Sequence, residues 1–157
     1  MIEVREAVKK DYPRVLELIT ELAIFEKEPD AVEVTLEELE RNGLGAEAIF
    51  ICFVGLYDGK IEGISLFYPR FSTWKGKTIH LEDLIVTEKM RGKGLGKALY
   101  DKVLKYAQDQ EVRRVEWVVL DWNKNAVEFY ESTGATIAKD WYLAQMDQKS
   151  LDNYINR

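Results

Sequence analysis

Residues 91 to 96 read Arg-Gly-Lys-Gly-Leu-Gly, which places three glycines and two positive charges within six positions. The hexamer follows an apolar run at 84–86 and precedes a segment with helical spacing. Glycines let a backbone approach a ligand because they carry no Cβ, and the amides that begin a helix attract anions. Arg91 and Lys93 add positive charge. The hexamer therefore predicts a cradle for a diphosphate group, or more simply a glycine turn that caps a helix.

Two common phosphate-binding motifs do not match this hexamer. A P-loop needs Gly, four residues and then Gly-Lys followed by Ser or Thr, whereas Gly96-Lys97 is followed by Ala98. The dinucleotide fingerprint GxGxxG fails as well, since Lys97 occupies the place of its last glycine. What remains is the pattern Arg-x-x-Gly-x-Gly.

Two adjacent acids, Glu82 and Asp83, interrupt an otherwise apolar strand pattern. Adjacent strand residues point to opposite faces, so at least one of these acids is expected to line a cleft in a sheet covered by helices. A salt bridge at the strand end is the alternative. His80 lies two residues earlier, on the face of Glu82 in a regular strand, and is either a proton relay or an ordinary half-buried histidine.

Asn123, Ala126 and Tyr130 are spaced three and four residues apart, so they form one stripe along an expected helix. A phenol with an ordinary pKa near 10 is protonated at neutral pH and can act as a general acid. A core aromatic with its hydroxyl at the surface would fit the same spacing.

Alternating strands and helices must position these residues. Strands are expected at 2–7, 49–57, 60–68, 78–86, 114–120, 135–138 and 141–146, and helices at 11–28, 35–42, 95–106, 123–133 and 151–155. The Asp58-Gly59 pair predicts a tight hairpin, and 69–77 is expected to be a loop. Because a helix separates the strands at 78–86 and 114–120, these two are expected to pair in parallel through a right-handed crossover.

The composition bounds the class of protein. The chain has 157 residues, 46% of them apolar, and is expected to form one domain over 1–157. No apolar run approaches the roughly 20 residues that span a bilayer, and the N-terminus does not resemble a signal peptide. The net charge is −6, and the single cysteine, Cys52, lies in an apolar strand where a small buried side chain is expected. We expect a cytoplasmic protein that binds neither membrane nor nucleic acid.

The hexamer and the order of elements together resemble the GCN5-related N-acetyltransferases (GNAT), and more closely their diamine (spermidine/spermine) and thialysine branch. Four segments carry the resemblance: Glu-Leu-Ala-Ile-Phe-Glu at 21–26, Leu-Glu-Asp-Leu-Ile-Val at 81–86 with the hexamer, Asp-Trp-Asn at 121–123, and Phe129-Tyr130 with Gly134-Ala135. The resemblance implies an α/β (α+β) GNAT fold. Its central sheet would be mixed and mostly antiparallel, with a splayed parallel strand pair at the cofactor site and helices on both faces.

The resemblance also implies roles for individual residues. Glu82 would be the general base, acting through ordered water, and Tyr130 the general acid that protonates the coenzyme A thiolate. A bulge in the strand before the hexamer would open a slot where the pantetheine arm of acetyl-CoA pairs with backbone groups. The implied cofactor-binding residues are Leu84, Ile85, Val86, Arg91, Gly92, Lys93, Gly94, Leu95, Gly96, Lys97, Asn123, Ala126 and Tyr130, and the implied substrate-binding residues are Phe25, Glu26, Glu82, Glu116, Trp117 and Val118.

The implied activity is acetyl-CoA-dependent N-acetylation of a small polyamine or a thialysine- or lysine-like substrate, by direct attack of a primary amine in a ternary complex. A base is needed, since an amine with a pKa near 10.4 is unprotonated in only about one molecule in 10³ to 10⁴ at neutral pH. A protein or peptide N-acetyltransferase and a non-catalytic coenzyme A-binding module remain alternatives. Phe25 and Asp121 depart from the diamine pattern and leave the acceptor open. The branch forms homodimers, and the apolar residues at 141–143 offer a pairing surface.

Overall fold

The computed structural model describes all 157 residues of the chain. They divide into two compact units, Met1–Val118 and Val119–Arg157. The first unit contains a five-stranded sheet flanked by helices. The second contains two helices joined by a long segment without regular structure. None of the helices combines the length and apolar character that a membrane crossing requires.

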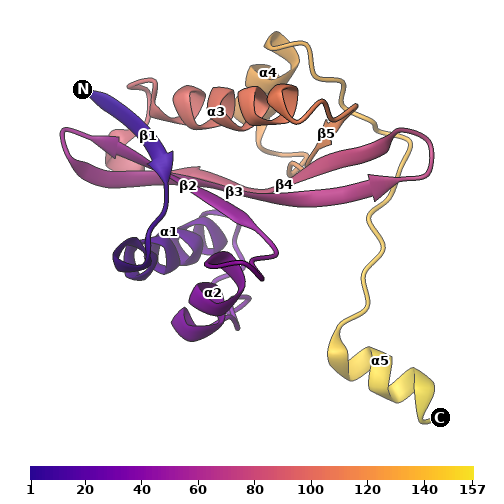
Figure 1. Cartoon of the computed structure of the whole chain (residues 1–157). Coiled ribbons are helices and arrows are strands. Elements are labelled where there is room, and N and C mark those ends of the chain that lie inside the picture. Colours follow the sequence, from indigo (N-terminus) through magenta and orange to yellow (C-terminus); the bar gives the residue numbers. More distant parts are fainter. The chain divides into compact units, whose positions relative to one another are not determined.

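The sheet of the first unit has the strand order β1-β2-β3-β4-β5. The first four strands pair antiparallel with their neighbours, whereas β4 and β5 pair in parallel. The expected mixed, mostly antiparallel sheet is therefore confirmed (Figure 1). The strands are β1 (Ile2–Glu6), β2 (Ile51–Tyr57), β3 (Lys60–Ser72), β4 (Gly76–Val86) and β5 (Val115–Glu116).

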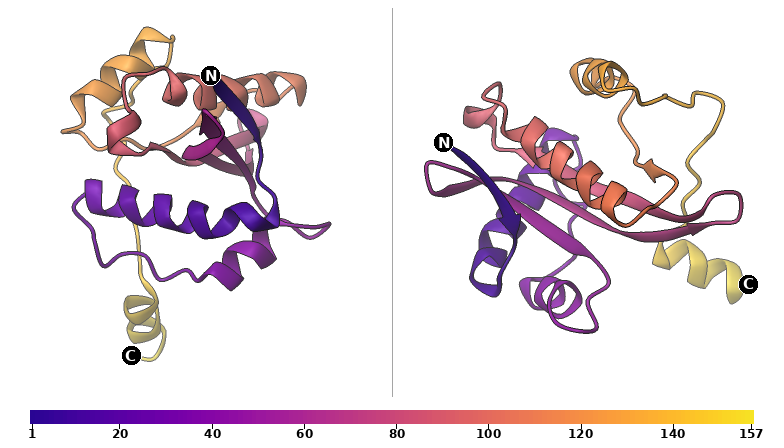
Figure 2. Two further views of the ribbon diagram at one scale, coloured as in Figure 1. Left: turned by 90° about the vertical axis from the view of Figure 1, so that its left-hand side faces the viewer. Right: turned by 45° about the horizontal axis from the view of Figure 1, so that its top comes forward.

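Helices cover both faces of this sheet, as expected. Figure 2 shows α1 (Tyr12–Phe25) and α2 (Leu36–Gly43) on one face and α3 (Leu95–Asp109) on the other. Two short 3-10 helices, η1 (Lys9–Asp11) and η2 (Glu88–Met90), precede α1 and α3. The core on the α1 side is apolar and includes Val15, Leu18, Val54, Ile64 and Ile85.

Close packing of α3 on the sheet depends on a glycine in β3. A Cβ at Gly63 would lie 2.8 Å from the carbonyl oxygen of Ile85 and 2.9 Å from the side chain of Leu99. Since backbone cannot move aside as a side-chain tip can, only glycine fits there. This contact brings the beginning of α3, and the hexamer before it, against the end of β4.

The Asp58-Gly59 hairpin is confirmed, with φ angles of 50° and 82° at its two residues. The loop expected at 69–77 is wrong, because β3 continues to Ser72 and β4 begins at Gly76. The pairing of β2 with β3 begins at Phe67, so Pro69 has no strand neighbour on the β2 side. Because the N–H that proline lacks would face this open edge, no hydrogen bond of the sheet is lost and proline is tolerated there.

A bulge interrupts β4 at Glu82, within the strand that precedes the hexamer. Asp83 is paired with Leu66, and Leu81 is paired with Phe67, so one extra residue lies between two consecutive pairs. An extra residue bends the strand and resets the alternation of its side chains. The bulge implied by the family resemblance is therefore present.

The second unit contains α4 (Lys124–Ser132) and α5 (Gln148–Ile155). The expected strands at 135–138 and 141–146 are wrong, since neither segment forms one. The expected strand at 114–120 is also too long, because β5 ends at Glu116. Alternating apolar residues make a strand only where a neighbouring strand supplies hydrogen-bond partners, and these segments have no such neighbour.

Candidate active site

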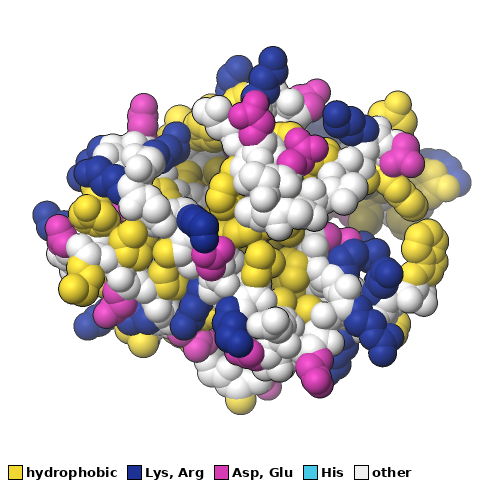
Figure 3. Space-filling view, turned by 90° about the horizontal axis from the view of Figure 1, so that it is seen from above, with side chains coloured by type: hydrophobic (Ala, Val, Ile, Leu, Met, Phe, Trp, Pro, Cys, Tyr) yellow, Lys and Arg dark blue, Asp and Glu magenta, His cyan; other side chains and the backbone are white.

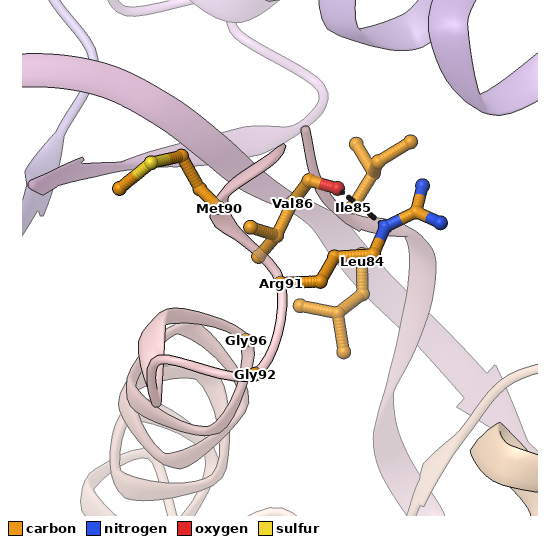
Figure 4. Close-up of a pocket in the computed structure, with 7 residues that line it drawn as sticks. All are labelled: Leu84, Ile85, Val86, Met90, Arg91, Gly92 and Gly96. Atoms are coloured by element: carbon orange, nitrogen blue, oxygen red, sulfur yellow. Dashed lines mark hydrogen bonds between the residues drawn. The ribbon is translucent and has the colours of Figure 1, made fainter. Parts of the chain in front are cut away.

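The glycine turn of the hexamer adopts the backbone that its sequence predicts. Gly92 and Gly94 have φ angles of 79° and 90°, a region that is costly for residues with a Cβ. Gly94 is the N-cap of α3, so the first amides of that helix adjoin the turn. A cleft of about 200 Å³ lies beside the turn and is lined by Leu84, Ile85, Val86, Met90, Arg91, Gly92 and Gly96 (Figure 4). Helix amides beside an open cleft fit a diphosphate with a chain attached.

The basic side chains of this region are already engaged within the chain. Nε of Arg91 donates to the carbonyl oxygen of Val86 at 3.0 Å (Figure 4), and the guanidinium lies 4.8 Å from the centre of the Phe25 ring. Lys93 lies over an aromatic ring of β2. Lys97 pairs with an aspartate on the next turn of α3. Arg91 therefore helps to hold the turn against β4 as well as supplying charge.

The parallel strands separate just before the site. β4 pairs with β5 only through Ile79 and His80. The stretch 84–86 thus has no strand partner on that side, where only the carbonyl of Val86 is engaged, by Arg91, while its other side pairs with β3. Unpaired amides and carbonyls in an extended strand can accept an extended ligand as an additional strand would. The expected splayed strand pair is confirmed, and 84–86 lines the cleft (Figure 4).

Three carboxylates, those of Glu26, Glu82 and Asp83, lie close together near the end of α1 and the bulge of β4. Burial, and then the charge of Glu82, raises the pKa of Glu26. Burial, together with the charges of Glu82 and Glu26, raises the pKa of Asp83 to about 7. The hydroxyl of Tyr68 donates to Oε1 of Glu82 at 2.8 Å, and Nε2 of His80 lies 3.8 Å from the same oxygen. A cationic amine bound beside these carboxyl groups would favour their charged forms, so the cluster suits a cationic amine.

The bulge explains why both β4 acids belong to this cluster. Asp83 is paired with Leu66, which packs in the core on the α1 side. Tyr68 lies two residues beyond Leu66 and therefore shares that face. Because Tyr68 binds Glu82, both acids lie over one face. The expectation from strict alternation, that they point to opposite faces, is wrong because the bulge adds a residue between the two pairs.

Sequence reasoning left three residues of this region without a role. Asp83 carried a signal, as a second acid in an apolar strand. Tyr68 carried none, because its contact with Glu82 depends on the register of β3 against β4. Met90 lines the cleft from η2 and is one apolar residue in an irregular segment, which no periodic pattern identifies.

The remaining substrate-binding candidates lie on and after β5. The carboxylate of Glu116 pairs with the guanidinium groups of Arg70 and Arg114. Trp117 packs edge-on against a tyrosine of α3, with 5.7 Å between ring centres. Val118 is exposed. The negative charge of Glu116 is therefore neutralised by arginines of the same chain, whereas no arginine or lysine pairs with Glu26, Glu82 or Asp83.

The stripe expected on the helix after Asn123 is present in α4. The side chain of Asn123 caps the helix by accepting from the amide of Ala126 at 3.4 Å. Tyr130 lies one turn beyond Ala126 and is buried. The stripe belongs to the second unit, and its contact with a cofactor stays a prediction.

Two further expectations concern Cys52 and the surface charge. Burial raises the pKa of the Cys52 thiol to about 12, so the buried side chain is not a nucleophile at neutral pH. On the face shown in Figure 3, Lys and Arg side chains are interspersed with Asp and Glu. A continuous basic surface is not visible there.

Comparisons with known proteins agree with this geometry. Residues 5–135 match the model of the acetyltransferase (GNAT) family. The chain is 35% identical to a thialysine N-epsilon-acetyltransferase of Bos taurus, with 96% of this chain and 95% of that protein aligned. It is 36% identical to one of Caenorhabditis elegans, over 90% and 89% of the two chains.

A solved structure, an integron cassette protein of V. cholerae, has the same fold. It superposes with a TM-score of 0.79 over 99% of this chain and 98% of its own, at 19% identity. Identity this low supports the fold alone, whereas the family match and the two relatives also support the family and the kind of enzyme. The chain therefore belongs to the acetyltransferase (GNAT) family and is an N-acetyltransferase, an enzyme that draws its acetyl group from acetyl-CoA.

Proposed function

We propose that the enzyme acetylates a primary amine of a thialysine- or lysine-like molecule or a small polyamine, by direct attack in a ternary complex. One observation carries the proposal. The bulge at Glu82 brings Glu82 and Asp83 of β4 together near Glu26 at the end of α1, just before the stretch 84–86 that has no β5 partner. An acceptor amine and an extended cofactor arm can therefore meet on one strand.

The residues of the glycine turn fit acetyl-CoA. Amides of Gly92 and Gly94 and the start of α3 would hold the diphosphate, with Lys93 and Lys97 nearby in the chain. Backbone groups of 84–86 would pair with the pantetheine arm, and an amide there would polarise the acetyl carbonyl. Acetyl-CoA supplies an activated thioester. Asn123 and Ala126 would line the same cofactor from α4.

Two side chains would carry protons. Glu82, through ordered water, would remove a proton from the ammonium group so that the amine nitrogen gains a free electron pair. Tyr130 would give its proton to the departing thiolate, because a phenol remains protonated at neutral pH. Positioning both groups against bound reactants supplies much of the remaining acceleration.

The carboxylate cluster favours an acceptor with a second cationic group. Glu26 and Asp83 can pair with an ammonium distant from the reacting nitrogen, with Phe25 as an apolar wall. Trp117 and Val118 follow the short β5 and would border the acceptor. Glu116 would contribute less, since two arginines match its charge. The relatives named for thialysine support the same class of acceptor.

A thiol-release assay tests this function directly. Acetyl-CoA is supplied with thialysine, lysine, spermidine, spermine, putrescine or a short peptide, and free coenzyme A is measured. We expect turnover with one or more of the small amines at kcat/KM well above that for peptides. Turnover restricted to peptides would show a protein N-acetyltransferase instead.

The Glu82→Gln variant tests the base. We expect kcat to fall at least a hundredfold, with the affinity for acetyl-CoA unchanged. Glu37→Gln, on the exposed side of α2, is the matched control and should behave as the wild type. Wild-type turnover in Glu82→Gln would remove this residue from the mechanism.

The same proposal extends to domain, assembly and location. Because the family match spans the boundary between the two units, we propose one GNAT domain over 1–157. Trp141, Tyr142 and Leu143 are 70%, 98% and 68% exposed, so we propose a homodimer in which this segment packs on a second copy. Light scattering after gel filtration should give a dimer, and Trp141→Ser a monomer. The free, buried Cys52 suits a reducing, cytoplasmic compartment.

A further inference from the structure

The hydroxyl of Tyr68 is aimed at one oxygen of the proposed base. It donates to Oε1 of Glu82 at 2.8 Å, across the bulge in β4. Nε2 of His80 lies 3.8 Å from that same oxygen. No hydrogen bond or ion pair in the chain engages Oε2, so the two oxygens of Glu82 are in different environments. One is held by the protein, and the other is available.

The ring of Tyr68 is itself fixed in place. Tyr68 is paired across the strands with His80, and their ring centres are 5.4 Å apart. Burial and the hydrogen bond to Glu82 raise the pKa of Tyr68 to about 12. The phenol therefore keeps its proton throughout the pH range in which the enzyme would work, and it stays a donor.

The bulge makes such a tether necessary. Glu82 is half exposed, and a solvent-exposed glutamate side chain samples many rotamers. Its residue is also the extra one in the ladder, so the strand register constrains its direction less than that of its neighbours. A hydrogen bond from a rigid aromatic ring removes this freedom and selects one rotamer.

We propose that Tyr68 is a positioning residue for the proton transfer, holding Oε1 of Glu82 so that Oε2 faces the acceptor. This inference rests on the proposed function of Glu82 as the base. In the transfer an N–H bond of the ammonium breaks, the proton passes through water to Oε2, and the electron pair stays on nitrogen. Tyr68 keeps its own proton and does not touch the substrate.

The charged groups around Glu82 define the expected pH effect. They are Glu26 from α1, Asp83 and His80 from β4, and Tyr68 and Arg70 from β3. Of these, Tyr68 alone donates a hydrogen bond to the Glu82 carboxylate. Removing that donor destabilises the ionised form, so the acidic limb of the kcat/KM profile should move to higher pH.

Tyr68→Phe tests the inference, with Tyr106→Phe on α3 as control because that ring packs against Phe53 and Phe67 on the opposite face of the sheet. We expect kcat/KM for the amine to fall about tenfold at pH 7 and the acidic limb to move upward. Acetyl-CoA affinity and thermal stability should stay near wild type, since the ring is retained. Tyr106→Phe should leave the profile unchanged. Wild-type kcat/KM and an unmoved acidic limb in Tyr68→Phe would overturn the inference.

A double variant separates this inference from the proposed base. Tyr68→Phe should cause no further loss in a Glu82→Gln background, because the two side chains act as one unit. A full tenfold additional loss there would show that Tyr68 acts through another group and would overturn the inference. If Glu82→Gln is inactive and Tyr68→Phe is normal, only the tether is wrong. If Glu82→Gln is fully active, the base and the tether both fail.

Discussion

The hydroxyl of Thr87 donates to the carboxylate of Glu21, 3.0 Å away, although 66 positions separate the two residues. The same carboxylate accepts from the amide of Glu88 at 3.0 Å. Glu21 thus links the last turns of α1 to the start of η2, which leads into the glycine turn. The contact of Arg91 with Phe25 is a second link between these regions. The end of α1, near the proposed acceptor site, is therefore connected by direct contacts to the segment that leads into the proposed cofactor site.

Removal of the Glu21 carboxylate should weaken cofactor binding. Hydrogen bonds to a charged group contribute about 1.5 to 3 kcal/mol, and loss of these frees the segment that positions the turn. We expect Glu21→Ala to raise the Kd for acetyl-CoA about tenfold in a calorimetric titration. Glu17→Ala, one turn earlier and highly exposed, is the control. Equal affinity in both variants would show that the turn is held without Glu21.

Gly94→Ala should also lower acetyl-CoA affinity about tenfold. A Cβ at φ 90° costs roughly 1 to 2 kcal/mol and favours a changed start of α3. Gly45→Ala is a matched control, since Gly45 has a φ of 82° with no atom within 4 Å of an added Cβ, and it lies outside the site. Both variants should lose similar thermal stability. Unchanged affinity in Gly94→Ala would argue against an anion site at this helix start.

Tyr130→Phe tests the general acid. The expected result is a fall in kcat of well over tenfold, because the thiolate then leaves without a proton donor, whereas acetyl-CoA affinity stays nearly constant. Tyr154→Phe, on the exposed side of α5, keeps wild-type kinetics. Steady-state assays with a calorimetric Kd distinguish the two effects. Turnover like that of the wild type would exclude Tyr130 as the acid.

Asp83 should make the enzyme less stable as the pH rises. Its pKa is about 7 in the folded chain, against 3.8 for the free side chain. Below pH 4 the group is protonated in both states, and above pH 7 folding must bury the charge. The free energy of unfolding therefore falls between pH 4 and pH 7, by up to about 4 kcal/mol from this group.

Urea unfolding at pH 5 and pH 8 measures this effect. Asp83→Asn removes the titrating group and keeps the volume, so its unfolding free energy should fall less between the two pH values than that of the wild type. The variant should also be the more stable protein at pH 8. A wild-type pH dependence in Asp83→Asn would show that the carboxyl is not the source.

Local features of the site were predictable from neighbouring residues. Gly94 and the start of α3 follow from the hexamer, because a left-handed turn needs glycine and a helix begins where the next residues have helical spacing. Asn123 as the cap of α4 follows in the same way, since its partner Ala126 is three residues away. These interactions join residues that are only a few positions apart, so the local sequence is enough to predict them.

The remaining features of the fold and of the site depend on the pairing between strands. Glu82 was identified as a candidate from its type and position, but its partner Tyr68 and its place beside Asp83 depend on a bulge that only the pairing of β3 with β4 creates. The same dependence explains the extension of β3 past Pro69 and the absence of a strand at 141–146. A strand pattern specifies which residues alternate, whereas hydrogen bonds to a distant segment determine whether a strand forms and where its register shifts.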